Sequence, residues 1–382
     1  MKSLKIIFAV WDTGRAGGTR AIYEIGNRLS GKGHDVKIVA LGGEHKWFNV
    51  RVPVEYVEVP FLLKPALGLY HLLFLTSKKV DYFSVNAFAK KLGFHADMVK
   101  ALAHALKKCS NVDVSVATWY PTALAVSLSG VSKPYYFMQD FPELVLTGGE
   151  YGLRTFYITL RLPFHFLTNS TYTRDVVLNQ QPNAEVTTIG AGVNTEVFYP
   201  RNSQIIDISN KRVIMIMLRG LKFKGDDIAV KALNIVNRKI PIHVLIVGSA
   251  RALDKVKPEI TFTYIHFGDM SDENLAKIYS SADTFVFTSY VEGFGLPPLE
   301  AMACGTPVVT TDCKGNRDYA RDGYNCLVSP PGEPLAIAEQ VLKVLSDDRL
   351  GEKLRNGGLE TAKKWNWDVV VTNLEESLKE HN

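Results

Sequence analysis

The sequence predicts an α/β protein made of two doubly wound domains, each a parallel sheet with helices on both faces. The chain has 382 residues and a mass of 42.5 kDa, which exceeds the usual ceiling for one hydrophobic core. Short runs rich in Val and Ile alternate with amphipathic helical stretches from end to end, a pattern typical of parallel sheets. Hydrophobic residues make up 46% and charged residues 22% of the chain, so disordered, collagen-like and coiled-coil proteins are excluded.

The predicted strands are short apolar runs, five in the first half of the chain and four in the second. They are residues 5–10, 36–41, 113–118, 135–138, 164–168, 213–218, 242–247, 283–288 and 307–311. Helices are predicted between them where apolar residues recur every three or four positions, as from Ala21 to Leu29 and from Leu335 to Leu345.

A polar segment with one proline, residues 199–211, predicts the boundary between the domains. It separates an N-terminal Rossmann-like domain, residues 1–198, from a C-terminal one, residues 212–364. The chain closes with an amphipathic helix at 365–382, which we expect to pack back on the first domain.

The spacing of the cysteines and histidines predicts the cellular location of the protein and whether it binds a metal. The four cysteines form no C-x-x-C pair and no disulfide framework, so we expect a reducing, cytoplasmic location. The apolar stretch at the N-terminus turns acidic and glycine-rich, which predicts a buried strand and not a signal peptide. Because no D-x-D motif occurs and no histidine has metal-ligand spacing, we expect no metal and no cofactor.

The charge is unevenly distributed along the chain. Residues 1–190 carry 21 of the 44 basic and 14 of the 39 acidic side chains, a net charge of +7, and the rest of the chain carries −2. Residues 61–95 mix lysines with aromatic side chains. One interpretation is peripheral contact with an anionic membrane; the other is helices packed on the first sheet with solvated lysines. We expect no nucleic acid partner.

Two Rossmann-like domains first raise the hypothesis of a dinucleotide enzyme. The first strand is followed by Gly14, Gly17 and Gly18, which do not form G-x-G-x-x-G. The second strand ends in Gly42-Gly43 and offers no carboxylate for a ribose. A hydride-transferring dehydrogenase is therefore disfavoured.

The strongest signal is TSYVEGFGLPPLEAMACGTPVV, residues 288–309. A predicted strand ends, a glycine loop follows, and a helix starts near Pro297, where the missing proline N–H has no intrahelical partner. The start of a helix suits a phosphate or a sugar hydroxyl, and Glu292 and Glu300 both lie within reach of such a ligand. The backbone N–H groups that we expect to face it are those of Phe294, Gly295 and Leu296.

A second signal is LRGLKFKGDD, residues 218–227, which follows the first strand of the second domain. Arg219, Lys222 and Lys224 cluster where strand ends form the crevice of an open α/β sheet. An arginine fork with a lysine point charge suits a diphosphate. Three solvated basic side chains are the alternative.

Taken together, these motifs resemble glycosyltransferase family 4, whose members are retaining enzymes of the GT-B fold. The resemblance rests on E-x7-E (Glu292, Glu300), on R-x4-K-G (Arg219, Lys224, Gly225) and on GTPVV at 305–309. Looser matches are GG at 17–18, NSTYTRDVV at 169–177, IGAGVNTEVFYP at 189–200, DGYNCLVSPP at 322–331, Trp365 and Trp367. The resemblance covers essentially the whole chain and implies two domains facing a central cleft.

The resemblance also implies roles for single residues on the donor side. Arg219 and Lys224 hold the donor diphosphate, Glu300 takes the ribose hydroxyls, and Glu292 binds the donor sugar. The amides of Phe294, Gly295 and Leu296 surround sugar and phosphate. Gly17 and Gly18 let the backbone of the first domain approach the diphosphate, and Gly248 with the stretch 266–270 lies where such enzymes hold the base.

Two departures from the family pattern concern donor and acceptor identity. Family members commonly carry a histidine after the fourth strand of the first domain, where this chain has Gln139 and Asp140. Some rhamnosyltransferase-like branches share that Gln-Asp pair, so both residues are candidates for the acceptor side. At 314–318 the string KGNRD replaces the commoner G-G-x-x-E, with Asp318 in place of the glutamate.

The function expected on this basis is metal-independent, retaining transfer of a hexose-type sugar from a nucleotide-sugar to a glycan, lipid-linked or small-molecule acceptor. A nucleotide-sugar epimerase and a glycogen-synthase-like polymerising enzyme are alternatives within the fold. A non-catalytic module that binds sugar nucleotides is the alternative from another class.

Overall fold

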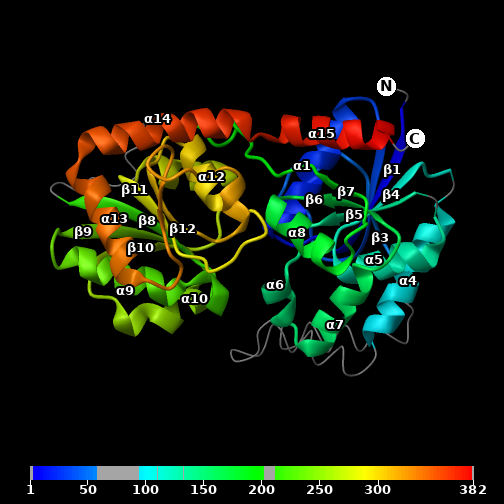
Figure 1. Ribbon diagram of the computed structural model, residues 1–382, viewed down its shortest axis with the longest axis horizontal. Helices are drawn as coiled ribbons and strands as arrows, with labels where there is room; N and C mark the ends of the chain where they lie inside the picture. Colours follow the sequence, from blue (N-terminus) through cyan, green and yellow to red (C-terminus); the bar gives the residue numbers. More distant parts are fainter. Residues whose placement is uncertain (1–2, 58–93, 110, 132, 202–210, 381–382) are drawn as a thin grey trace. The chain divides into compact units, whose positions relative to one another are not determined.

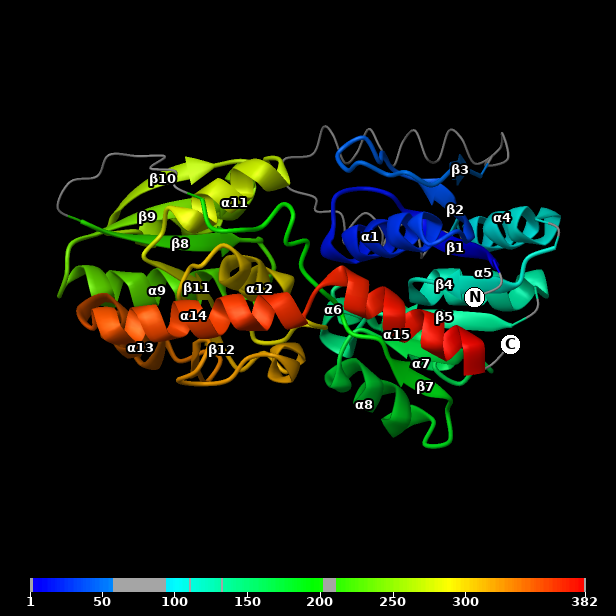
Figure 2. The same ribbon diagram turned by 90° about the horizontal axis from the view of Figure 1, so that it is seen from above.

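The computed structural model describes residues 3–57, 94–109, 111–131, 133–201 and 211–380. These residues form two compact units, one of Met1–Gly190 with Val371–Asn382 and one of Ala191–Val370. Each unit is a parallel sheet with helices on both faces (Figures 1 and 2). The prediction of two Rossmann-like α/β domains is therefore confirmed. Of the lysine–aromatic stretch 61–95, everything before residue 94 lies outside the described residues.

The first unit is built on a seven-stranded sheet in the order β3-β2-β1-β4-β5-β6-β7. Its strands are β1 (Lys5–Asp12), β2 (Asp35–Gly42), β3 (Val54–Tyr56), β4 (Val114–Ala117), β5 (Pro134–Met138), β6 (His165–Thr168) and β7 (Val186–Thr188). Its helices are α1 (Gly17–Gly31), α4 (Phe94–Lys108), α5 (Tyr120–Ser129), α6 (Pro142–Leu146), α7 (Glu150–Thr159) and α8 (Thr171–Gln180). Every residue of β1 from Ile6 to Trp11 is buried, because successive side chains point to opposite faces and both faces are covered.

The second unit is built on a six-stranded sheet in the order β10-β9-β8-β11-β12-β13. Its strands are β8 (Arg212–Leu218), β9 (Ile242–Gly248), β10 (Thr263–Phe267), β11 (Thr284–Phe287), β12 (Val308–Thr311) and β13 (Leu327–Ser329). Its helices are α9 (Asp226–Asn237), α10 (Ala250–Val256), α11 (Asp272–Ser280), α12 (Leu296–Ala303), α13 (Pro334–Ser346) and α14 (Asp348–Lys364). Ile214 and Ile216 of β8 join one apolar cluster with α9 and α13, while Met215 between them is buried on the opposite face.

The boundary between the units falls earlier than the predicted linker. The chain joins the second unit at Ala191, whereas residues 199–211 were expected to connect the domains. Val193 donates its N–H to the Trp365 carbonyl at 2.9 Å, and a Cβ on Gly192 would lie 2.4 Å from the Asn366 backbone. These contacts pack the segment after Gly190 against the second unit. Of the predicted linker, residues 202–210 lie outside the described residues.

The last helix, α15 (Trp367–Glu380), belongs to both units, since its residues from Val371 onward group with the first. Glu375 accepts hydrogen bonds from Lys32 Nζ and His34 Nε2. His34 Nδ1 accepts the Leu4 N–H at 3.2 Å, which places the ring proton on Nε2. The helix is therefore bonded to the first unit by polar contacts with residues just before β2.

None of the helices in the described ranges combines the length and apolar character needed to cross a bilayer. All four cysteines carry free thiols.

Candidate functional site

The predicted donor-side residues of the second unit lie in loops at the carboxyl ends of its strands. The strand order reverses direction between β8 and β11, and open α/β sheets bind ligands outside the carboxyl ends of the strands at such a point. The loop Arg219–Gly225 follows β8, and the loop Thr288–Gly295 follows β11. Both loops singled out in the sequence therefore meet at the switch point of the second sheet.

An ion pair joins the two loops. Lys224 Nζ donates to both carboxylate oxygens of Glu292 at 2.8 Å. Ser289 Oγ donates to Glu292 Oε1 at 2.7 Å. The side chains of Lys224 and Glu292 are only 19% and 11% exposed, so water screens the pair less than it screens a surface pair. The loop after β8 thus supplies the counter-charge for the carboxylate of the loop after β11.

The loop after β8 is shaped by a carboxylate at the start of α9. Asp226 accepts the backbone N–H groups of Arg219 at 3.0 Å and Gly220 at 2.6 Å. Burial raises the pKa of Asp226 above its usual range. Gly225 has φ 67°, and a Cβ there would lie 2.3 Å from the Thr288 carbonyl oxygen. Only glycine fits where this loop crosses the end of β11.

Arg219 and Lys224 share this loop but differ in surroundings. The Arg219 side chain is exposed, and its guanidinium lies 3.8 Å from Met217 Sδ. Lys224 is half-buried and paired. The two predicted phosphate ligands are therefore a solvent-exposed cation and a cation already engaged by Glu292.

The helix start predicted near Pro297 begins at Leu296, with prolines in the first turn of α12. Gly295 precedes it in the left-handed region, with φ 87°, and its carbonyl accepts the hydroxyl of Tyr319. Phe294 is buried against Tyr319 and Trp365. Aromatic packing and the Tyr319 hydroxyl therefore fix the position of the glycine loop.

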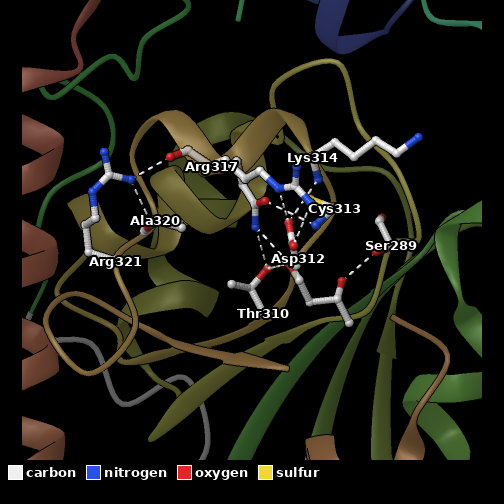
Figure 3. A network of polar contacts seen from close by, with 10 residues as sticks. Ser289, Thr310, Asp312, Cys313, Lys314, Arg317, Ala320 and Arg321 are labelled. Carbon is white, nitrogen blue, oxygen red and sulfur yellow. Dashed lines mark hydrogen bonds and ion pairs between the residues drawn. The ribbon is translucent and has the colours of Figure 1, made fainter. Parts of the chain in front are cut away.

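Residues 310–317 pack against the loop that carries Glu292 and form a network of hydrogen bonds among themselves (Figure 3). A Cβ on Gly315 would lie 2.4 Å from the Gly293 carbonyl oxygen, so the two backbones touch. Asn316 accepts the Cys313 N–H and donates to the Thr311 carbonyl. Arg317 binds Asp312 through two hydrogen bonds of 2.7 and 2.8 Å.

The KGNRD string overlaps this network. Lys314 has φ 66°, a conformation that glycine adopts more readily, and its backbone bridges to Glu292. Asp318 is the last residue of the short 3-10 helix Gly315–Asp318.

Glu300 lies in the middle of α12 and is 6% exposed. Tyr279 from α11 donates its hydroxyl to Glu300 Oε2 at 3.2 Å. Gly248 ends β9 with its carbonyl accepting from His266 Nε2 at 2.8 Å. A Cβ on Gly248 would lie 2.2 Å from the Leu218 carbonyl oxygen, so its glycine identity follows from backbone contact.

In the first unit, the structure brings Gly17, Gly18 and Gln139 together. Gly17 opens α1, and Gln139, directly after β5, donates its amide to the Gly18 carbonyl at 3.3 Å. Asp140 is 4% exposed and accepts from the Tyr136 hydroxyl at 3.0 Å and the Tyr120 N–H at 3.2 Å. Burial raises the pKa of Asp140 to about 7. Gln139 therefore lies at the end of β5, and the buried Asp140 carboxylate binds the first residue of α5.

Three residues that bind the site's loops and carboxylates were not predicted from the sequence: Ser289, Asp226 and Tyr279. Ser289 lacks the flanking glycines of a nucleophile elbow and was not among the predicted site residues, yet it binds Glu292. Asp226 was not singled out from the basic string that precedes it, yet it accepts two backbone N–H groups of that string. Among the residues that the structure describes, no group of three or more metal-ligating side chains occurs.

The sequence matches the family described as "Glycosyl transferases group 1" over residues 199–364. This stretch is therefore similar to a glycosyl transferases group 1 domain. It contains Arg219, Lys224, Glu292 and Glu300.

Curated relatives match parts of the chain. O-antigen chain mannosyltransferase B of Escherichia coli is 39% identical over 107 residues, 28% of this chain and 28% of the relative. D-inositol 3-phosphate glycosyltransferase of Corynebacterium diphtheriae is 26% identical over 224 residues, 53% of this chain and 52% of the relative. The chain thus spans about a quarter to a half of the length of these relatives.

Solved structures match the fold over nearly the full chain. Sucrose-phosphate synthase of Thermosynechococcus elongatus superposes with a TM-score of 0.80 at 17% identity, covering 98% of both chains. HepE of Anabaena, in complex with UDP and glucose, superposes with a TM-score of 0.79 at 17% identity, covering 98% of this chain and 99% of its own. The fold is that of the GT-B glycosyltransferases.

Proposed function

We propose that this chain is a retaining glycosyltransferase that moves a sugar from a nucleotide-sugar donor to an acceptor hydroxyl in glycan biosynthesis. One observation carries the proposal: Lys224 and Glu292 form an ion pair at the switch point of the second sheet, inside the stretch matched by the glycosyl transferases group 1 family. The relatives named as O-antigen chain mannosyltransferase and D-inositol 3-phosphate glycosyltransferase support an acceptor rich in hydroxyl groups. The HepE complex with UDP and glucose supports a nucleotide-sugar donor.

In this proposal the protein acts by stabilising the departing nucleoside diphosphate. Arg219 and Lys224 supply positive charge, and the N-terminus of α12 supplies backbone N–H groups and a partial positive charge. Such preorganised groups stabilise charge that develops in the transition state without reorganising. Glu300 binds the ribose of the donor.

The Lys224–Glu292 pair suggests how the donor is received. Lys224 Nζ has three N–H donors, and both Glu292 oxygens accept from it in this structure. A diphosphate beside Lys224 competes for the ammonium, and the Glu292 oxygens then accept hydrogen bonds from hydroxyls of the donor sugar. The acceptor hydroxyl attacks from the face that the leaving group vacates, and a phosphate oxygen takes its proton.

The test combines binding with turnover. A thermal-shift screen with UDP, GDP, ADP, CMP and dTDP identifies the nucleotide, and release of nucleoside diphosphate from the matching donor is then measured with candidate acceptors. We expect release that depends on acceptor, a product with the donor's anomeric configuration by NMR, and full activity in EDTA. Glu292→Gln should lower turnover while binding of the free nucleotide persists.

Three outcomes contradict the proposal. Nucleotide binding without turnover across the acceptor panel indicates a binding module. An isomerised sugar nucleotide without transfer indicates an epimerase. Loss of activity in EDTA that added divalent metal restores indicates a metal-dependent mechanism.

A further inference from the structure

Tyr279 lies beneath the candidate site and its hydroxyl reaches a carboxylate of that site. The residue is near the end of α11 and is fully buried. Its hydroxyl donates to Glu300 Oε2 at 3.2 Å, and Met217 Sδ lies 3.6 Å away. The described residues thus offer a phenol that meets the carboxylate of α12 from the interior of the second unit.

The ring of Tyr279 is fixed by its neighbours. Phe285 meets it edge to face at 5.2 Å between ring centroids, and Phe198 does so at 6.3 Å. The Tyr279 carbonyl accepts the Thr306 hydroxyl at 2.6 Å. Because both ring and backbone are held, the position of the phenol oxygen is set by packing and does not depend on Glu300.

The chemistry of the pair is that of a neutral donor and a buried acceptor. Glu300 is 6% exposed, and a carboxylate with so little access to water needs hydrogen-bond donors. Burial, with the nearby Glu300 charge, raises the pKa of Tyr279 well above its usual range, so the phenol keeps its proton. The O–H therefore stays available as a donor and holds one carboxylate oxygen of Glu300.

We infer that Tyr279 is a positioning residue for ribose recognition, whose hydroxyl orients the Glu300 carboxylate toward the vicinal hydroxyls of the donor. The inference rests on the proposed function, in which Glu300 holds the ribose. A vicinal diol is read best by a carboxylate whose two oxygens are held in one orientation, since both hydroxyls then bond without a loss of side-chain freedom.

The experiment compares Tyr279→Phe with a matched control. Tyr324 donates its hydroxyl to Glu360 Oε2 at 2.6 Å on the surface of the same unit, so Tyr324→Phe removes an exposed bond of the same chemical type that does not involve Glu300. Three probes are titrated by calorimetry: the ribonucleoside diphosphate that binds the parent protein, its 2′,3′-dideoxy counterpart, and inorganic pyrophosphate. Melting curves of each variant monitor folding.

We expect Tyr279→Phe to weaken the ribonucleoside diphosphate roughly tenfold and to leave the other two probes unchanged. Tyr324→Phe should bind all three probes as the parent does. Equal binding of the ribonucleotide by Tyr279→Phe and parent overturns the inference, and so does an equal loss for all three probes, which signals general damage to the unit. A parent protein that binds no nucleoside diphosphate removes the proposed function and the inference with it.

Glu300→Asp provides a second route if Tyr279→Phe fails to fold. The variant keeps the negative charge and withdraws it from the phenol by one methylene. We expect the same selective loss of the ribonucleotide, with pyrophosphate unchanged. A ribonucleotide affinity equal to that of the parent shows that the contact with Tyr279 is not needed and overturns the inference.

Discussion

The ammonium of Lys224 and the carboxylate of Glu292 are each poorly exposed and each neutralised by the other. Removing one partner leaves an uncompensated charge in a place that water reaches poorly, which costs more than the loss of a surface ion pair. Arg219 stands in contrast, because its side chain is exposed. The two cations therefore contribute differently to the stability of the fold, although both are proposed to bind the diphosphate.

We predict that Lys224→Met lowers the free energy of unfolding by about 1–3 kcal/mol and also weakens nucleoside diphosphate binding. Arg219→Met should weaken binding with little effect on unfolding. Lys231→Met is the control, since Lys231 pairs with Asp227 at 3.0 Å in an exposed ion pair on α9. Urea unfolding and titration measure both quantities. Equal stability of the Lys224 and Lys231 variants contradicts the prediction.

Asp140 predicts a pH dependence of stability. Its pKa is raised from 3.8 to about 7 by burial, so between these values the folded protein holds a proton that the unfolded chain has released. The contribution of Asp140 to the free energy of unfolding therefore falls as pH rises from about 4 to about 7. Above about pH 7 this contribution no longer changes with pH.

Asp140→Asn removes this titration while its amide oxygen can still accept from Tyr136 and Tyr120. We expect the variant to gain stability relative to the parent protein as pH rises through this window, measured by urea unfolding at several pH values. Parallel profiles for the two proteins would show that Asp140 does not titrate there.

Among the elements, the sequence predicted the strands inside each sheet and not those at the edges. The four strands without a predicted counterpart, β3, β7, β10 and β13, are the four outermost strands. Three of them are largely half-buried or exposed, so their sequences lack the continuous apolar run that marks a strand buried on both faces. β13 has only three residues, too few for a pattern.

The residues of the candidate site could be predicted where they lie close together in one sequence motif. Glu292, Glu300 and the glycine loop follow from one motif beside one strand. Ser289, Asp226 and Tyr279 were not predicted, because each acts through a hydrogen bond whose partner is set by packing of separate elements. The Lys224–Glu292 ion pair spans 68 residues of sequence, a separation that no local pattern encodes.

The crossing of two loops at Gly225 gives a prediction for this element. Gly225→Ala should destabilise the second unit by about 2–3 kcal/mol, because a Cβ would both strain a positive φ and meet the Thr288 carbonyl. Gly323→Ala isolates the strain, since Gly323 has φ 68° with nothing within 4 Å, and it should cost about 1 kcal/mol. Melting and urea curves measure the difference, and equal losses would exclude the clash.

For the whole molecule, we propose that the acceptor is lipid-linked or anionic and is met at a membrane surface. The net charge of +7 in residues 1–190 motivates this, together with the lysines and aromatic residues of 61–95. We predict co-sedimentation with vesicles that contain anionic lipid and none with neutral vesicles. Binding should weaken with salt, because exposed charges are screened over roughly 8 Å at physiological ionic strength.

The double substitution Lys78→Gln with Lys79→Gln should reduce this binding, since each lysine near an anionic leaflet contributes about 1 kcal/mol. Lys231→Met, in the second unit, serves as its control. A protein that stays in the supernatant with anionic vesicles at low salt does not contact the membrane in this way.

The division of α15 between the two units has a consequence for biosynthesis. Residues 1–190 leave the ribosome before residues 191–370, yet Lys32 and His34 of the first unit bind a helix that is translated after both stretches. During most of elongation, these two residues have no Glu375 to bind. The first unit is therefore completed only after the second unit has been made, and a nascent chain stalled before residue 371 lacks part of the first unit.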